Sequence, residues 1–162
     1  MSIPHLSPTV RTRDRDAAIA AVRRLGLRLT ASRRHVLECL HDAGRPVTAE
    51  EIASGLYGRR ARCDLASVYR NLETLEEAGL ARHMHLGHGP GLYAPAGGDE
   101  FVVCERCGRS EVVPPATLER VRAAVLAAVG YRPSFAHFPI PALCGGCEAK
   151  LSAREEDRHV RP

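Results

Sequence analysis

The sequence predicts an α+β protein organised as two small domains. Three observations lead to this fold class: a series of short helical patterns ends in a well-capped helix over residues 64–79, a hairpin pattern follows it, and two C-x-x-C pairs lie in the last third of the chain. Helices followed by a β-hairpin are typical of a winged helix-turn-helix domain, and paired cysteine knuckles are typical of a zinc-stabilised domain. The predicted segments are a flexible N-terminus (1–14), a winged-helix domain (15–95), an α/β domain (96–150) and a flexible tail (151–162).

The composition limits the possible functions. With 162 residues, 23 Lys+Arg and 19 Asp+Glu, the chain is long enough for a buried core and is not strongly basic overall. Positive charge is concentrated locally, because the segment from Arg11 to Arg34 holds eight arginines against two acids. Such a segment suits contact with phosphate, although solvated arginine runs are also common. No apolar run is long enough to span a membrane and no secretory h-region is visible, so we expect a soluble cytoplasmic protein.

The first three helices are predicted from apolar periodicity and from capping residues. They are expected over residues 16–25, 31–43 and 49–57. Thr30 is placed to cap the second helix. Thr48 and Glu51 have the S/T-x-x-E spacing of a capping box at the start of the third, and Leu56 is expected to face the core near its end.

The helix over residues 64–79 is the best defined element of the sequence. Asp64 is placed to accept N–H groups of its first turn, and Gly79 can adopt the left-handed conformation that ends it. One stripe of the helix is apolar, formed by Leu65, Val68, Leu72 and Leu75. Polar, aromatic and cationic residues lie off that stripe near its start, as in a helix that enters a DNA major groove. Taken alone, the pattern also fits an ordinary amphipathic surface helix.

Beyond this helix the pattern changes to short extended segments. LARHMHL and GLYAP flank the turn GHGPG, which predicts a β-hairpin, the wing of the first domain. The Gly-containing stretch 94–99 indicates a hinge. In the second domain FVVC and SEVV are strand-like, a helix is expected over residues 115–129 before Gly130, and a strand is expected over residues 131–140. The helix is expected to bury Leu118, Val121, Val125 and Val129.

Four of the six cysteines form two C-x-x-C pairs, Cys104 with Cys107 and Cys144 with Cys147. In a reducing compartment such pairs indicate metal or redox chemistry before structural disulfides. Two knuckles supply four thiolates, which complete the tetrahedral coordination of Zn²⁺ and leave no position open for water, so the predicted site is structural. The alternative is a pair of redox-active dithiols. That would require a C-x-x-C at a helix N-terminus in a βαβ context, which the sequence predicts for neither pair.

With these elements in place, the chain resembles the ferric uptake regulator (Fur) family of metal-responsive bacterial repressors. The resemblance covers roughly residues 16–150 and is carried by GLRLTASRRHVLECL, TAEEI, SVYRNLETLEEAGL, CERCG and CGGC. It implies that the second domain is an α/β dimerisation domain. It also implies a homodimer that binds a pseudo-palindromic operator in double-stranded DNA when a sensed divalent metal is bound as corepressor.

The resemblance also implies which residues contact DNA. Tyr69 and Arg70 match the family's DNA-contacting tyrosine and arginine, and Arg28 matches the basic residue that approaches the minor groove. The expected base-contacting face consists of Ser67, Tyr69, Arg70 and Asn71. The expected contacts to the phosphate backbone come from Arg28, Arg33 and Arg34.

The metal-sensing residues match the family less well. The histidine run that precedes the first knuckle in the family is replaced here by GGDEF. Three of the four ligands of the family's site on the dimerisation domain have counterparts in Glu100, Glu119 and His137, whereas Gly98 replaces the first histidine. The family's hinge site falls on residues whose side chains cannot bind a metal, namely Pro46, Ala94, Phe101 and Val112.

The wing offers replacement ligands. His83 and His85 point to the same side of a strand, so their imidazoles could converge with Asp99 or Glu100. Nitrogen and oxygen ligands suit Zn²⁺, Fe²⁺ or Mn²⁺, and ligand type does not separate these metals. The competing explanation is that the wing histidines contact DNA phosphate.

The predicted mechanism couples metal binding to DNA binding through the hinge. Metal bound between the wing and the dimerisation domain would stiffen residues 94–99 and fix the distance between two recognition helices. Two alternatives stay open: a peroxide-sensing repressor of the same family, in which histidines or thiols such as Cys63 are oxidised, and a zinc-stabilised protein-interaction module without a DNA role. No Ser/His/Asp set, phosphate loop or open three-ligand zinc motif is visible, so we expect no enzyme, small-molecule substrate or membrane partner.

Overall fold

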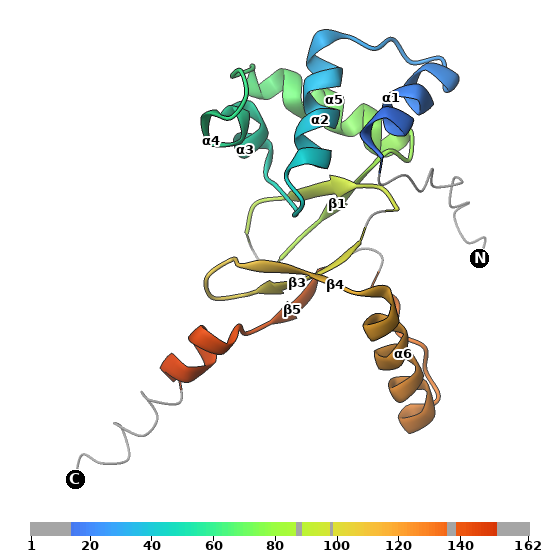
Figure 1. Cartoon of the computed structure of the whole chain (residues 1–162), viewed down its shortest axis with the longest axis vertical. Coiled ribbons are helices and arrows are strands. Elements are labelled where there is room, and N and C mark those ends of the chain that lie inside the picture. The colour runs from blue at the N-terminus through green and yellow to red at the C-terminus, as the bar shows by residue number, and fades with distance from the viewer. Residues whose placement is uncertain (1–13, 87–88, 98, 136–138, 152–162) are drawn as a thin grey trace. The chain divides into compact units, whose positions relative to one another are not determined.

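The computed structural model describes residues 14–86, 89–97, 99–135 and 139–151. The chain divides into two compact units, Met1–Asp99 and Glu100–Pro162, so the division falls after the boundary expected at residue 95 (Figure 1). The expected flexible ends lie outside the described residues, except for Asp14 at one end and Leu151 at the other. No described helix is long and apolar enough to cross a membrane.

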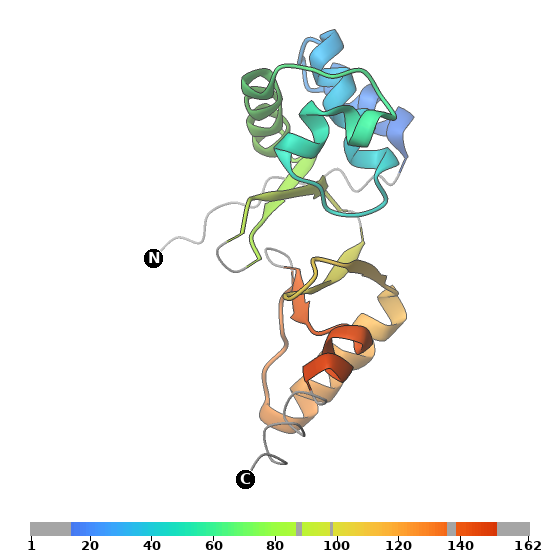
Figure 2. The ribbon, with the colours of Figure 1, turned by 90° about the vertical axis from the view of Figure 1, so that its left-hand side faces the viewer.

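Five helices and a two-stranded hairpin form the described part of the first unit. The helices are α1 Arg15–Arg24, α2 Ala31–Asp42, α3 Ala49–Ala53, α4 Gly55–Gly58 and α5 Leu65–Glu77. Figures 1 and 2 show these helices gathered on one side of the hairpin. Each predicted N-cap is confirmed, because Thr30, Thr48 and Asp64 accept hydrogen bonds from N–H groups in the first turns of α2, α3 and α5. The side chain of Glu51 also completes the predicted capping box.

The prediction of one continuous helix over residues 49–57 is wrong, since α3 ends at Ala53. After Ser54, the four residues from Gly55 to Gly58 all have positive φ (75°, 51°, 61° and 83°) and make one left-handed turn. Left-handed backbone costs roughly 1–2 kcal/mol for a residue other than glycine, so Leu56 and Tyr57 are strained. The turn closes through a 2.9 Å hydrogen bond from the Arg60 N–H to the Gly55 carbonyl. Leu56 still faces the core as predicted.

The hairpin predicted after α5 is confirmed. Strand β1 (Ala81–Met84) pairs antiparallel with β2 (Leu92–Pro95), and Ala81 lies opposite Pro95. Val47 and Tyr93 add a further antiparallel bridge through reciprocal N–H···O bonds of 2.9 and 2.7 Å. The wing is therefore fixed to the segment that connects α2 with α3.

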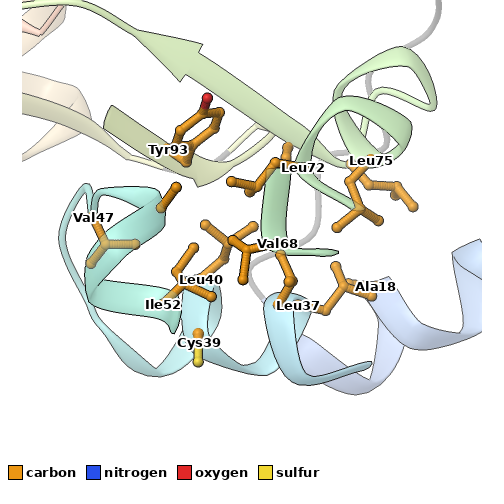
Figure 3. Close-up of a cluster of buried hydrophobic side chains, with 14 of the residues drawn as sticks. Ala18, Leu37, Cys39, Leu40, Val47, Ile52, Val68, Leu72, Leu75 and Tyr93 are labelled. Atoms are coloured by element: carbon orange, nitrogen blue, oxygen red, sulfur yellow. The ribbon is translucent and has the colours of Figure 1, made fainter. Parts of the chain in front are cut away.

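The core of the first unit lies between α2, α3, α5 and the hairpin. Figure 3 shows Leu40, Ile52, Val68 and Leu72 among its fully buried side chains. Cys39 is also fully buried and packs within this core. Leu65, predicted on the packed stripe of α5, is instead exposed because it lies in the first turn, before the helix reaches the core.

The second unit contains a three-stranded sheet and one long helix. Its described elements are β3 Glu100–Cys104, β4 Ser110–Val113, α6 Pro115–Val129 and β5 Ile140–Ala142. The strand order is β4-β3-β5, with β4 antiparallel and β5 parallel to β3. The strand predicted over residues 131–140 is wrong in extent, because residues 131–135 belong to no strand and β5 begins only at Ile140. Residues 136–138 lie outside the described residues.

Helix α6 has the predicted bounds and ends at Gly130 in the left-handed conformation, but its packing differs from the prediction. Of the four residues expected to be buried, only Leu118 is, Val125 is partly buried, and Val121 and Val129 are 43% and 62% exposed. The apolar residues of α6 recur at helical spacing, as predicted. Within the described part of the second unit, however, no element covers the side of the helix that carries Val121 and Val129.

Candidate metal centre and nucleic-acid interface

The parallel pairing of β3 with β5 brings the two cysteine knuckles together. Cys104 ends β3 opposite Ala142 of β5, so the knuckle that follows each strand begins at the same edge of the sheet. The four sulfur atoms all lie within 4.8 Å of one another, and Cys107 Sγ is 3.7 Å from Cys144 Sγ. A tetrahedron with Zn–S bonds of about 2.3 Å has sulfurs about 3.8 Å apart. The four residues therefore fit a structural zinc ion.

Hydrogen bonds from backbone N–H groups favour the thiolate form of two of these cysteines, which suits cation binding. The Cys144 N–H donates to Cys104 Sγ at 3.4 Å, and this bond, with N–H donors at Cys107 and Arg106, lowers the pKa of Cys104 to about 6. The Cys147 N–H likewise lowers the pKa of Cys144. The hydrogen bond with Cys144 raises the pKa of Cys147 to about 12. Sulfurs this close cannot all carry negative charge unless a cation lies between them, so the donor set matches a divalent metal.

The second cysteine pair has one feature of a redox-active dithiol. Residues 145–151 are helical, so Cys144-x-x-Cys147 does lie at the start of a helix, contrary to the prediction. All six cysteines are free thiols. In the cluster each knuckle faces the other, which is the arrangement of a closed metal site and not of an isolated dithiol.

The two wing histidines lie together, as expected for residues two positions apart. The ring centroids of His83 and His85 are 4.3 Å apart, and His83 also stacks on Tyr93 at 4.6 Å with an interplanar angle of 6°. His83 Nε2 is buried against Gly91, where an added Cβ would lie 2.4 Å from it. In this arrangement His83 can offer a metal only its Nδ1 atom.

The other predicted sensing residues lie in different surroundings. Glu119 Oε1 accepts a 2.6 Å hydrogen bond from Arg132, and this bond, with Arg122 nearby, lowers the pKa of Glu119. Asp99 accepts a hydrogen bond at its backbone carbonyl from Arg82, and Glu100 begins β3. His137 lies outside the described residues. Among the residues that the structure does describe, the cysteine cluster is the only group of three or more potential ligands.

The outer face of α5 presents two of the residues that were expected to contact DNA. Tyr69 is 45% exposed and Arg70 is exposed beside it. The Tyr69 hydroxyl donates a 3.1 Å hydrogen bond to Glu50 Oε1 of α3, which raises the pKa of Tyr69. Sequence reasoning missed Glu50, although its position in the first turn of a capped helix next to α5 was readable.

The sequence assigns Asn71 to the exposed face of α5, and this assignment is wrong. Asn71 is 8% exposed, because it lies three residues after Val68 and four before Leu75, inside the buried stripe. Its Nδ2 atom donates to Ser32 Oγ at 3.1 Å and to the Ser67 carbonyl at 2.8 Å. Ser67 is partly buried, and its hydroxyl lies 2.8 Å from that of Ser32.

The predicted phosphate-contacting arginines fall into two groups. Arg28 and Arg34 are exposed, whereas Arg33 is partly buried and donates from Nη1 to the Arg28 carbonyl at 2.6 Å. Arg33 therefore holds the turn before α2. Arg60, which sequence reasoning did not single out, is bound by Glu38 at 2.6 Å and by Asp42. The spacing of these two acids on one face of α2 was the available signal.

Comparison with known proteins gives consistent matches. The sequence model of the ferric uptake regulator family matches residues 24–137. A peroxide operon regulator from Bacillus subtilis is 26% identical over 134 residues, covering 82% of this chain and 92% of that protein. A ferric uptake regulation protein from Neisseria meningitidis is 26% identical over 135 residues, covering 82% and 94%.

Solved structures agree in fold. The Helicobacter pylori ferric uptake regulator Fur, described as having three functional metal-binding sites, matches with a TM-score of 0.63 at 18% identity. The match covers 83% of this chain and 94% of that one. At this level of identity the similarity is one of fold alone.

Proposed function

This chain belongs to the ferric uptake regulator family of regulators, and on that premise we propose that it is a metal-dependent transcriptional repressor that binds a pseudo-palindromic operator as a homodimer. The observation that carries the proposal is the exposed pair Tyr69 and Arg70 on a capped helix of a winged-helix unit, in a chain that also holds a four-cysteine cluster. A cytoplasmic location is part of the proposal, because operator DNA is found there.

In this proposal α5 is the recognition helix. Tyr69 and Arg70 contact base edges, and Arg28 and Arg34 contact the phosphate backbone, while Arg33 supports the turn that carries Arg28. Phosphate contacts of this kind make binding strongly salt-dependent. Two half-sites one or more helical turns apart, about 34–36 Å per turn, would be bound together only when two recognition helices have the matching separation.

The proposed homodimer forms through the second unit. Three apolar side chains of α6 and one just after the helix are exposed in the single chain, namely Val121, Leu126, Val129 and Tyr131. An uncovered apolar face on a long helix supports association, because burial of that surface against a second copy is favourable.

Two kinds of metal are proposed. Zn²⁺ is the structural ion, held by Cys104, Cys107, Cys144 and Cys147. A second, regulatory divalent metal, Zn²⁺, Fe²⁺ or Mn²⁺, is the corepressor, and the multiple metal sites described for the Helicobacter relative support a second site. Its proposed ligands come from His83, His85, Asp99, Glu100, Glu119 and His137. Binding of Glu119 would require release of Arg132.

Addition of the regulatory metal is expected to strengthen binding to the chain's own promoter DNA. Coupling free energies between sites are about 1–3 kcal/mol, so the expected increase is about 5- to 150-fold. Fluorescence anisotropy with labelled promoter DNA, on protein that retains its structural zinc, measures this effect. Arg70→Ala is expected to abolish binding with or without metal, whereas Arg109→Ala, at an exposed arginine of the second unit, should change neither. Equal affinity with and without metal would contradict the proposed coupling.

The double variant His83→Ala/His85→Ala tests the wing ligands. If the two imidazoles hold the regulatory metal, affinity without metal stays at the wild-type value and the increase on metal addition disappears. A different result is expected if the histidines contact phosphate, because affinity then falls equally with and without metal and the salt dependence becomes weaker. Metal titrations at two salt concentrations separate these results. An equal loss of affinity with and without metal would rule out His83 and His85 as ligands of the regulatory metal.

The similarity to a peroxide operon regulator supports a second candidate function, repression relieved by peroxide. Burial raises the pKa of the Cys63 thiol, which leaves little of the reactive thiolate and disfavours this cysteine as the sensor. Oxidation would then fall on the histidines or on the knuckle thiols. Mass spectrometry of the metal-loaded protein after mild peroxide treatment identifies the oxidised residue, if there is one.

A further inference from the structure

We propose that Asn71 is a positioning residue, whose hydrogen bonds to Ser32 and Ser67 fix the rotation of α5 on α2 and so direct Tyr69 and Arg70 toward DNA. This inference rests on the proposed DNA-binding function. It assigns Asn71 a role inside the protein, in place of contact with a base.

The position of Asn71 is unusual for its chemistry. Among the residues that the structure describes, it is the only buried polar or charged residue. It shares the buried stripe of α5 with Val68, Leu72 and Leu75, which Figure 3 shows in the core. A leucine would complete this stripe without any polar group to satisfy. Burial of an amide without partners costs roughly 1–3 kcal/mol in proteins, so the hydrogen bonds of Asn71 are needed to offset its burial at a position where an apolar residue would pack more easily.

The hydrogen bonds of Asn71 connect two helices at one point. Nδ2 donates to Ser32 Oγ of α2 at 3.1 Å and to the Ser67 carbonyl of α5 at 2.8 Å. The hydroxyls of Ser32 and Ser67 are 2.8 Å apart and complete the group. Ser32 lies in the first turn of α2, whose start is fixed by the Thr30 cap. The cluster therefore connects the start of α2 to the middle of the proposed recognition helix.

Hydrogen bonds can fix a helix rotation that apolar contacts leave open. Apolar packing has no directional preference, and cores tolerate alternative arrangements of similar volume. A hydrogen bond is lost when donor and acceptor turn apart. A buried asparagine in a coiled coil specifies register in the same way, at a cost in stability.

Because Tyr69 and Arg70 lie on the same helix as Asn71, the rotation of α5 sets the directions of their side chains. Successive residues of an α-helix are about 100° apart around the axis, so Tyr69 lies about 200° from Asn71 and Arg70 about 100° from it. When Asn71 faces Ser32, Tyr69 must point outward, as its exposure shows. A small roll of α5 would misdirect both side chains at once.

The variant Asn71→Leu tests this role. We expect a folded protein whose melting temperature equals or exceeds that of the wild type, because leucine fits the apolar stripe. Its affinity for promoter DNA should fall at least tenfold, while affinity for a scrambled duplex of the same length stays unchanged, because non-specific binding depends on phosphate contacts. The ratio of the two affinities is the readout, since a merely structural defect would lower both affinities and the melting temperature together.

Two further variants complete the experiment. Ser32→Ala removes the contacts of Asn71 and Ser67 with α2 and keeps the Asn71 bond within α5, so it should lower the ratio in the same direction by a smaller factor. Thr74→Ala is the matched control, because Thr74 donates a hydrogen bond to the Arg70 carbonyl within α5 and does not reach α2 in the described contacts. It should leave the ratio unchanged.

A readout without DNA separates this proposal from the proposed function. In ¹H–¹⁵N spectra of the free protein, Asn71→Leu should shift or broaden the amide signals of Tyr69 and Arg70, whereas Thr74→Ala, whose turn begins at Arg70, should leave the signal of Tyr69 unchanged. Unchanged signals at residues 69 and 70, or a wild-type affinity ratio in Asn71→Leu, would overturn the positioning role. If Asn71→Leu does not fold, an unchanged ratio in Ser32→Ala overturns it instead. A wild-type protein without preference for promoter DNA would overturn the proposed function, whatever the spectra show.

Discussion

Replacement of Cys104 with serine is expected to remove the structural metal and unfold the second unit. Serine replaces one thiolate of a four-sulfur set, and zinc binding to such sites contributes on the order of 10 kcal/mol in small zinc peptides. The described apolar core of this unit is small, with Phe101, Val103 and Leu118 among its few buried side chains. A unit of this size cannot offset the loss of the metal through its core alone.

Metal analysis and thermal unfolding of the full chain measure this effect. The wild type should carry one zinc per chain at the cluster, and Cys104→Ser should carry none and lose the unfolding transition of the second unit. The first unit should keep its own transition, because its hydrophobic core consists of residues from Ala18 to Tyr93. Cys63→Ser is the control, since this partly buried thiol lies outside the cluster. Retention of one zinc and of both transitions in Cys104→Ser would mean that the four sulfurs hold no structural ion.

Gly55→Ala is expected to destabilise the first unit by about 2–5 kcal/mol. Alanine at a positive φ costs about 1–2 kcal/mol, and overpacking costs about 1–3 kcal/mol more. The second contribution arises because a Cβ at Gly55 would lie 2.1 Å from the backbone carbonyl oxygen of Arg60, which cannot move aside without opening the turn. Urea unfolding followed by circular dichroism gives the change in free energy.

Gly58→Ala separates the two contributions. Gly58 has a φ of 83°, but an added Cβ there meets nothing within 4 Å, so only the backbone strain of about 1–2 kcal/mol is expected. Promoter binding should weaken more in Gly55→Ala than in Gly58→Ala, because the turn begins the connection that leads to α5. Equal losses of stability in the two variants would show that the contact between the added Cβ at residue 55 and the Arg60 carbonyl does not destabilise the first unit.

Capping residues made the helix starts predictable. Thr30, Thr48 and Asp64 each accept a hydrogen bond from the N–H three residues further along the chain, so the information is local. The cysteine cluster was predictable for a similar reason, because two C-x-x-C pairs have few other structural uses. The hairpin followed from its Gly-rich turn.

The errors arose where distant residues decide the structure. Helix α3 ends early because the chain turns back to bond Arg60 with Gly55. The role of Asn71 depends on Ser32, which lies 39 residues away in the sequence. Strand β5 is defined by parallel pairing to β3, which periodicity cannot reveal. Among the predicted sensing ligands, the ion pair of Glu119 with Arg132 was likewise invisible in the order of residues.

The closed base of the hairpin gives its tip freedom to vary. Val47 holds Tyr93 through two backbone bonds, and the Ala96 N–H donates to the Leu80 carbonyl at 3.0 Å, so both strands are anchored at their base. Insertions or deletions between Met84 and Leu92 would leave this anchor intact, provided that a glycine remains against His83. Evolution could therefore lengthen or shorten the tip, or change its charge, without altering the core of the first unit.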